Sequence, residues 1–199
     1  TIANLICRFY EPTGGQLKID GIDYRSCTQH SLRSQLGVVL QTPHLFSGTI
    51  RSNIQYGNLL ASDDLIKEAL TLVGAIDFVD RLSEEVGENG DKLSMGEKQL
   101  LSFARALLRK PRLLIMDEAT SSIDTLTEAK IQSGISQMIK GRTSIIIAHR
   151  LSTIKHCDRI LVISNGKIIE DGNHANLIRK GGHYHDLYTK QLSSIVKAL

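Results

Sequence analysis

The amino-acid sequence predicts an α/β domain with a largely parallel β-sheet. Short runs rich in β-branched and aliphatic residues, bounded by turn residues, alternate with segments of helical periodicity. The chain has 199 residues, 41% of them hydrophobic, which is enough for one substantial core but short for two. We therefore expect one domain over residues 1–199. The expected strands are residues 17–20, 37–40, 113–116, 144–148, 159–163 and 167–170.

Composition and charge exclude several classes of protein. The 24 basic and 21 acidic residues give a net charge of +3 and are scattered along the chain, so we expect no nucleic-acid partner. Cys7, Cys27 and Cys157 have no CxxC spacing, which argues against a disulfide framework or a zinc site. No apolar run approaches the roughly 20 residues that cross a bilayer. Because Thr1 is not a start methionine, we expect the chain to begin partway through a gene product.

The segment between the second and third expected strands has helical periodicity. Asp63 is a predicted helix cap, and one helical face after it is apolar at Leu65, Ile66, Ala69, Leu70 and Val73. A second amphipathic helix is predicted from the spacing of Leu100, Ala104, Leu107 and Leu108.

Near the C-terminus, Asn165-Gly166 predicts a tight antiparallel hairpin. Further apolar and aromatic residues are expected to pack in or on the core: Phe9, Tyr10, Leu126, Ala129, Ile135, Met138, Ile139, Tyr184, Leu187 and Tyr188.

Two acidic residues follow the third expected strand. Residues 113–116 form a continuous apolar run, typical of a strand buried on both faces, and Asp117 and Glu118 come directly after it. Open α/β sheets bind ligands at the carboxyl ends of their strands. There, Asp117 can hold magnesium while Glu118 accepts a proton from a water molecule that attacks a phosphoryl group. Taken alone, the pair fits equally well with acids that merely end a strand.

A second candidate site lies at the start of the helix before this strand. Ser94 and the backbone amides after it occupy the positive end of the helix, which favours an anion. The alternative is a capping box, in which Ser94 and Glu97 satisfy each other's backbone amides. Gly96 favours the anion site, because close approach of a phosphate to the backbone needs glycine whereas a helix gains nothing from it.

Two further polar residues follow expected strands. Neither indicates a function by itself, and each is interpreted together with the candidate sites above. Gln41 comes after residues 37–40 and offers an uncharged side chain that can orient water or contact magnesium. His149 comes after residues 144–148 and can hydrogen-bond a terminal phosphate. Because both follow strands of one expected sheet, they are predicted at the same carboxyl edge as Asp117.

In this order, the segments resemble the nucleotide-binding domain of an ATP-binding cassette (ABC) transporter over essentially the whole chain. Five motifs carry the resemblance: residues 39–41 resemble the Q-loop, 93–97 the signature motif, 113–118 the Walker B strand, 121–124 the D-loop and 148–150 the switch histidine. Residues 8–12, 44–50, 87–90 and 149–154 further resemble the branch of exporters with fused membrane and ATPase domains.

The resemblance implies a fold and a set of ligands. The fold is a P-loop NTPase with a RecA-like core, residues 1–51 and 111–199, and a helical subdomain over residues 52–110. The ligands are ATP and Mg²⁺, with Asp117 and Gln41 on Mg²⁺ and with Glu118, His149 and Gln41 as catalytic residues. The nucleotide-binding residues that the resemblance implies are Thr1, Ser94, Gly96, Glu97 and Asp124.

The resemblance also implies partners and a location. One partner is a second nucleotide-binding domain in a head-to-tail dimer, in which Ser94 and Gly96 of one domain close on ATP held by the other. The other partners are the transmembrane domains of an exporter, which the nucleotide-binding domains of such exporters contact through the loop around Glu88. The implied location is the cytoplasmic face of the cell membrane. ATP hydrolysis would power export, but the substrate and the choice between homodimer and heterodimer do not follow from these residues.

Three features depart from the family pattern. The signature motif reads Leu-Ser-Met-Gly-Glu where Leu-Ser-Gly-Gly-Gln is common, and Glu97 suits the helix dipole yet would repel a phosphate. Asn89 stands where exporters often have Arg. The glycine-rich Walker A loop and the N-terminal β-subdomain are missing from these residues, and Thr1 resembles the residue directly after that loop. We therefore expect the chain as given to bind ATP poorly and to lack ATPase activity.

Two alternatives fit parts of the pattern. One is a weakly catalytic or regulatory half of a heterodimeric ABC transporter, which Met95 and Glu97 favour and the presence of Glu118 disfavours. The other is a soluble ABC ATPase of DNA repair or chromosome structure, which would carry a long coiled-coil insertion that these residues lack. An ATPase domain of an exporter is therefore the main prediction.

Overall fold

The computed structural model describes residues 2–117, 125–148 and 151–196. The chain divides into two compact units, Thr1–Ile147 (unit 1) and Ala148–Leu199 (unit 2). Unit 1 contains α1 Ile2–Ile6, β1 Lys18–Ile19, β2 Ile22–Asp23, η1 Tyr24–Ser26, α2 Gln29–Ser34, β3 Leu36–Val39, α3 Ile50–Gln55, α4 Asp63–Leu72, η2 Ile76–Arg81, η3 Glu88–Gly90, α5 Met95–Leu108, β4 Leu113–Asp117, α6 Thr125–Ile139 and β5 Thr143–Ile147. Unit 2 contains α7 Leu151–Ile154, β6 Ile160–Ser164, β7 Lys167–Gly172, α8 His174–Lys180 and α9 His183–Val196.

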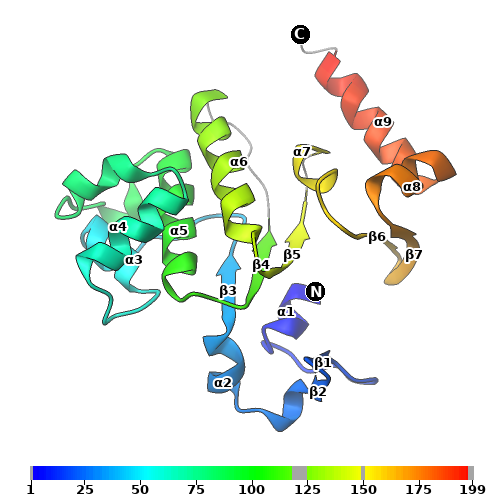
Figure 1. Ribbon diagram of the computed structural model, residues 1–199, viewed down its shortest axis with the longest axis horizontal. Helices are drawn as coiled ribbons and strands as arrows, with labels where there is room; N and C mark the ends of the chain where they lie inside the picture. Colours follow the sequence, from blue (N-terminus) through cyan, green and yellow to red (C-terminus); the bar gives the residue numbers. More distant parts are fainter. Residues whose placement is uncertain (1, 118–124, 149–150, 197–199) are drawn as a thin grey trace. The chain divides into compact units, whose positions relative to one another are not determined.

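Unit 1 is built on a three-stranded parallel sheet with the order β3-β4-β5 (Figure 1). Val39 of β3 pairs with Met116 of β4, and Asp117 at the end of β4 pairs with Ile147 of β5. β1 and β2 form a separate antiparallel pair. The predicted α/β class is therefore confirmed, and the three parallel strands lie within one residue of their expected bounds. The division into core and helical subdomain stays a prediction.

Strand β4 is covered on both faces, as its unbroken apolar run predicts. Leu114 and Met116 point into the larger hydrophobic cluster of unit 1, which they share with the helices α3 to α6. Ile115 points to the other face and packs in a smaller cluster with Tyr24 and Leu32. Successive side chains of a strand face opposite sides, so a strand between two layers must be apolar at every position.

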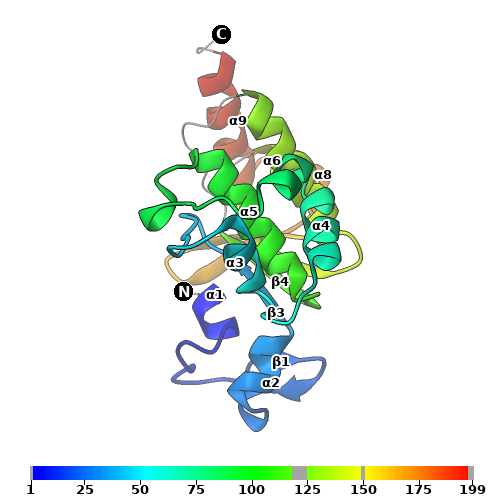
Figure 2. The same cartoon turned by 90° about the vertical axis from the view of Figure 1, so that its left-hand side faces the viewer.

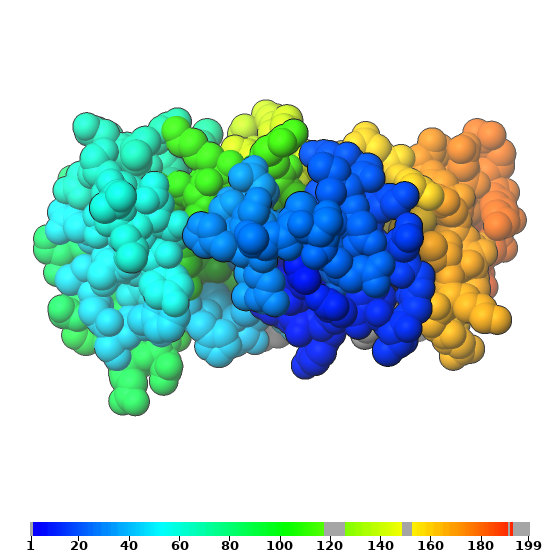
Figure 3. All heavy atoms as spheres, turned by 90° about the horizontal axis from the view of Figure 1, so that it is seen from below, coloured from blue at the N-terminus to red at the C-terminus, as the bar shows by residue number. Residues whose placement is uncertain are grey.

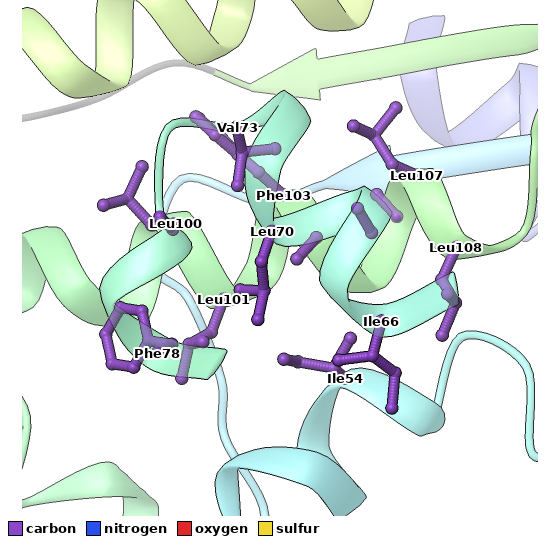
Figure 4. Packing of buried hydrophobic residues seen from close by; sticks show 14 of the residues in the cluster. Ile54, Ile66, Leu70, Val73, Phe78, Leu100, Leu101, Phe103, Leu107 and Leu108 are labelled. Carbon is purple, nitrogen blue, oxygen red and sulfur yellow. The ribbon is translucent and has the colours of Figure 1, made fainter. Parts of the chain in front are cut away.

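The helices α3, α4 and α5 lie side by side on one face of the sheet (Figure 2). Helix α5 is the most enclosed element, because ten of its fourteen residues are buried. Its Leu101 and Phe103 contribute to the larger cluster together with Ile66 and Leu70 of α4 (Figure 4). The predicted amphipathic helices are therefore both present.

The start of α4 differs from the sequence prediction, and its end has a recognisable motif. Ser62, rather than Asp63, is the N-cap, because its hydroxyl accepts the backbone N–H of Leu65. The helix ends at Leu72, where Gly74 takes a positive φ of 71° and the N–H of Ala75 donates to the carbonyl of Leu70. This pattern is a Schellman motif, which stops a helix at a glycine.

Four residues that were expected to pack in or on the core are exposed instead. Their exposed fractions are 56% for Phe9, 68% for Tyr10, 72% for Leu126 and 54% for Leu187. Each lies in a segment that does contribute other residues to a core, such as Cys7 near Phe9 and Tyr184 near Leu187. Apolar character alone therefore did not decide which face of these segments is buried.

Unit 2 is a β-hairpin followed by two helices. β6 and β7 pair antiparallel, and Asn165 and Gly166 both have positive φ, which confirms the predicted tight hairpin. The buried carboxylate of Glu170 on β7 accepts the backbone N–H groups of His183 and Tyr184 at 3.1 and 2.7 Å. An anionic group thus caps the positive end of α9 and fixes it to the hairpin. Within the described part of either unit, helices are too short or too polar to cross a membrane.

Leucine-to-alanine substitutions at a buried and an exposed site test this core. Leu101 is 0% exposed, and its replacement with Ala leaves a cavity between α5 and its neighbours, so we expect the free energy of unfolding to fall by about 2–5 kcal/mol. Leu60→Ala is the matched control, because Leu60 is 95% exposed and its loss should change stability by less than about 0.5 kcal/mol. Urea unfolding of the two variants measures both values, and similar losses would contradict this description of the core.

Candidate functional site

Gln41 and Asp117 lie at the same edge of the parallel sheet. Asp117 is the last residue of β4 and is half-buried, whereas Gln41 is exposed and lies two residues beyond the end of β3. Since Val39 pairs with Met116, Asp117 comes directly after the last paired rung of these two strands and Gln41 comes two residues after it. The predicted meeting of an amide and a carboxylate at one carboxyl edge is therefore what the topology produces.

The side chains at this edge suit a magnesium ion. Carboxylate and amide oxygens are hard ligands, and Mg²⁺ is commonly held by one or two carboxylates together with phosphate oxygens and water. No group of three or more His, Cys, Asp or Glu side chains with metal-binding geometry occurs among the described residues. The Asp117 carboxylate and the Gln41 amide are thus donors of the kind that hold Mg²⁺ together with phosphate oxygens and water.

Four of the predicted site residues lie outside the described residues. They are Thr1, Glu118, Asp124 and His149. Two of them adjoin described elements, since Glu118 follows Asp117 directly and His149 comes two residues after the end of β5 at Ile147. The roles of all four residues stay predictions.

The predicted capping box at the start of α5 is present. The backbone N–H of Glu97 donates to Ser94 Oγ at 3.2 Å, and the N–H of Ser94 donates to Glu97 Oε2 at 2.9 Å. This arrangement does not exclude an anion site. The amides of Met95 and Gly96 occupy the first helical positions, where geometry provides no intrahelical acceptor, and they remain directed out of the helix end. The capping box and a phosphate can therefore use different amides of the same turn.

The Glu97 carboxylate also forms an ion pair that sequence reasoning missed. Arg81 Nη1 donates to Glu97 Oε1 at 3.0 Å, while Arg81 Nε donates to Glu84 Oε2 at 2.9 Å. Burial raises the pKa of Glu97, but the hydrogen bonds from Ser94 and Arg81 outweigh it and bring the pKa below its usual value. Arg81 precedes Glu97 by 16 residues and belongs to η2, so no local pattern links them.

These residues form two separate groups on unit 1. No hydrogen bond or ion pair among the described residues joins Ser94 or Glu97 to Gln41 or Asp117. Helix α5 leads into β4 through a short turn and runs in the opposite direction, so its Ser94 end lies toward the carboxyl ends of the strands (Figure 1). The sheet edge and the helix end thus face the same side without meeting.

An exposed aromatic pair, which we call the Phe46–Tyr56 patch, forms a further candidate surface. The two rings lie 4.6 Å apart and are each about half exposed. Arg105 of α5 lies against both rings and donates to the carbonyls of His44 and Asn53, each at 2.8 Å. Burial lowers the pKa of Arg105 from its usual value. The guanidinium therefore fixes the patch to the most enclosed helix.

A cavity borders the Phe46–Tyr56 patch. It has a volume of about 250 Å³ and is lined by Phe9, Tyr56 and the three arginines Arg33, Arg105 and Arg109. Figure 3 views the molecule from below, with blue N-terminal residues and cyan residues of the helical segment on the visible face. The chain just before the Glu88 loop is also joined to the chain just after Phe46, because the N–H of Val86 donates to the carbonyl of Gly48 at 2.9 Å.

Comparison with known proteins gives consistent similarities. The family model described as "ABC transporter" matches residues 1–121, more than half of the 199 residues. The ABC transporter ATP-binding protein YknV of Bacillus subtilis is 51% identical over 201 residues, which cover 99% of this chain and 33% of that protein. The ATP-dependent lipid A-core flippase of Syntrophus aciditrophicus is 47% identical over 195 residues, covering 96% of this chain and 32% of that protein.

A solved structure is similar as well. The structure of a bacterial Atm1-family ABC exporter with ATP bound superimposes with a TM-score of 0.87 at 44% sequence identity. The match covers 96% of this chain and 34% of that one. The chain therefore spans about a third of the length of the curated relatives and of the structure that it matches.

The lowered pKa of Glu97 makes part of the stability depend on pH. Because the folded pKa lies below the value of 4.5 for a free glutamate, the unfolded chain binds the proton more readily. The Glu97 carboxylate therefore makes its full contribution to the free energy of unfolding above the pKa of free glutamate, and this contribution is lost as the pH falls through the folded pKa. We expect wild type to exceed Glu97→Gln by at most about 1 kcal/mol in the free energy of unfolding at pH 7, and this difference should shrink below about pH 4.5. Urea unfolding across this pH range checks the expectation, which a constant difference would contradict.

Proposed function

The chain belongs to the ABC transporter family, and from this premise we propose that it is the ATP-binding and ATP-hydrolysing domain that powers export of a substrate across a membrane. The observation that carries the proposal is that Gln41 and Asp117 follow paired strands at the same carboxyl edge of the parallel sheet, with the Ser94 end of α5 on the same side. Open α/β sheets bind ligands at this edge, and phosphates bind where backbone amides point out of a helix.

Each residue at the sheet edge would have one task in hydrolysis. Asp117 and Gln41 would hold Mg²⁺, which when bound neutralises charge on the phosphate oxygens. Glu118 would accept the proton of the water molecule whose oxygen attacks the terminal phosphorus, and His149 would hydrogen-bond the terminal phosphate. Glu118 is the next residue in the chain after the half-buried Asp117, which supports assigning it to the same strand end.

The Ser94 end of α5 would serve a second ATP molecule. We propose a head-to-tail dimer in which Ser94, Gly96 and the adjoining amides of one domain contact the phosphates held by its partner domain, with Asp124 near the interface. This division of tasks is supported by the separation of the two groups within unit 1. In this proposal a single domain presents two half-sites, and a second nucleotide-binding domain would complete each nucleotide site.

The Phe46–Tyr56 patch and the Glu88 loop would contact transmembrane domains at the cytoplasmic face of the membrane. The patch offers half-exposed aromatic rings beside a cavity, which is the kind of surface that receives an anchor residue from a partner. Arg105 connects the patch to α5, so the partner would rest on the same helix that carries Ser94. In the alternative, the chain is a weakly catalytic or regulatory half of a heterodimer. It would then hydrolyse ATP slowly but make the same contacts with the transmembrane domains.

Replacing Glu118 with Gln tests the catalytic assignment. In the full-length transporter we expect Glu118→Gln to retain ATP binding but to lower the hydrolysis rate by at least about 100-fold, because the amide cannot accept the proton of the attacking water. Glu68→Gln, at an exposed position of α4, is the matched control and should keep the wild-type rate. Phosphate release and retained nucleotide measure the two effects. Hydrolysis at the wild-type rate by Glu118→Gln would refute Glu118 as the base, and an inactive wild type would favour the regulatory alternative.

Replacing Tyr56 with Ala tests the contact with the membrane domains. We expect Tyr56→Ala to lower the maximal ATPase rate of the full-length transporter severalfold while its KM for ATP stays the same, since the patch contributes no residue to either proposed half-site. Tyr10→Ala removes a ring that is 68% exposed and serves as the control. A Tyr56→Ala variant with the kinetics of wild type would contradict this docking surface.

A further inference from the structure

We propose that Arg81 is a positioning residue for ATP at the signature motif, where it neutralises the Glu97 carboxylate and keeps it turned away from the bound phosphates. This inference rests on the proposed function, because it concerns the phosphate that the Ser94 end of α5 would contact. It assigns to η2, a segment outside the five motifs, a specific part in nucleotide binding.

The geometry leaves neither oxygen of the Glu97 carboxylate directed at a ligand. Oε2 accepts the backbone N–H of Ser94 at 2.9 Å, and Oε1 accepts Arg81 Nη1 at 3.0 Å. Each bond draws the side chain back along the first turn of α5, away from the outward-facing amides of Met95 and Gly96. The carboxylate would otherwise be free to rotate toward an approaching phosphate and repel it.

Arg81 is itself held in place from two other directions. Its Nε donates to Glu84 Oε2 at 2.9 Å, and its guanidinium lies 5.0 Å from the centre of the Phe78 ring. Phe78 is buried in the larger hydrophobic cluster, so the arginine is anchored to the helical core. The positive charge is therefore fixed beside Glu97 before any nucleotide arrives.

The neighbouring lysine does not provide the same charge. Lys98 follows Glu97 in α5, but its Nζ donates to the backbone carbonyl of Asn89 at 3.2 Å and thus faces the Glu88 loop. Among the described residues, Arg81 is the cation that forms an ion pair with Glu97. Arg81 is shared with Glu84, so removing it would leave two carboxylates without their common partner and make the charge beside this end of the helix more negative.

A double-mutant cycle in the full-length transporter separates this role from a structural one. Arg81→Gln alone should raise the KM for ATP roughly three- to tenfold with little change in kcat, because the Glu97 charge is no longer balanced. In the Glu97→Gln background the same Arg81→Gln change should alter KM by less than about twofold, since no carboxylate remains to be neutralised. Arg81→Lys should restore much of the wild-type KM.

Arg51→Gln is the matched control for this cycle. Arg51 forms an equally short ion pair with Asp63, at 2.9 Å, within the same helical part of unit 1, and its side chain pairs with Asp63 rather than with Glu97, so its loss should leave KM within about twofold of wild type. Thermal unfolding of every variant verifies that each is folded.

The outcomes distinguish this inference from the proposed function. An Arg81→Gln variant with the KM of wild type would overturn the inference, and so would an equal loss in both Glu97 backgrounds, which would mean that Arg81 acts only through the fold. The proposed function would fail differently, because wild type itself would then show no magnesium-dependent ATP hydrolysis and Glu118→Gln would have no effect.

Discussion

The burial of α5 is the constraint on which the rest of unit 1 depends. The helix contacts α3, α4, α6 and β3, and ten of its fourteen residues are buried. Each fully buried large aliphatic or aromatic side chain contributes roughly 1.5–3 kcal/mol of transfer free energy, so this helix accounts for a large share of the core. A helix enclosed to this degree has one position and one rotation relative to the sheet.

That single position places three candidate surfaces in a fixed relation. Ser94 caps the start of α5, Arg105 in its last turn holds the Phe46–Tyr56 patch, and the short turn after its end leads into β4 and Asp117. Packed interiors are stiff and transmit displacement rather than absorb it. A partner bound at the patch would therefore act on the same rigid element that presents Ser94 to a nucleotide, which is the physical basis for coupling transport to ATP in our proposal.

The acidic signature motif illustrates how tertiary structure alters a local conclusion. From the residues alone, Glu97 predicts both a capping box and repulsion of a phosphate. The capping box is present, and the repulsion is offset because Arg81 binds the second carboxylate oxygen. A charged residue at the end of a helix is thus compatible with an anion site when its own charge is balanced from another segment.

Local patterns in the sequence determined the parallel strands, the capping box and the Asn165-Gly166 hairpin, because side-chain period, cap chemistry and turn residues act over a few neighbouring positions. The end of α4 at Gly74 was also within reach of such reasoning. Only the tertiary structure decided that Phe9 and Leu126 are exposed and that Arg81 faces Glu97. Those outcomes depend on which distant segments pack together, and residue type and spacing along one stretch of chain carry no information about that.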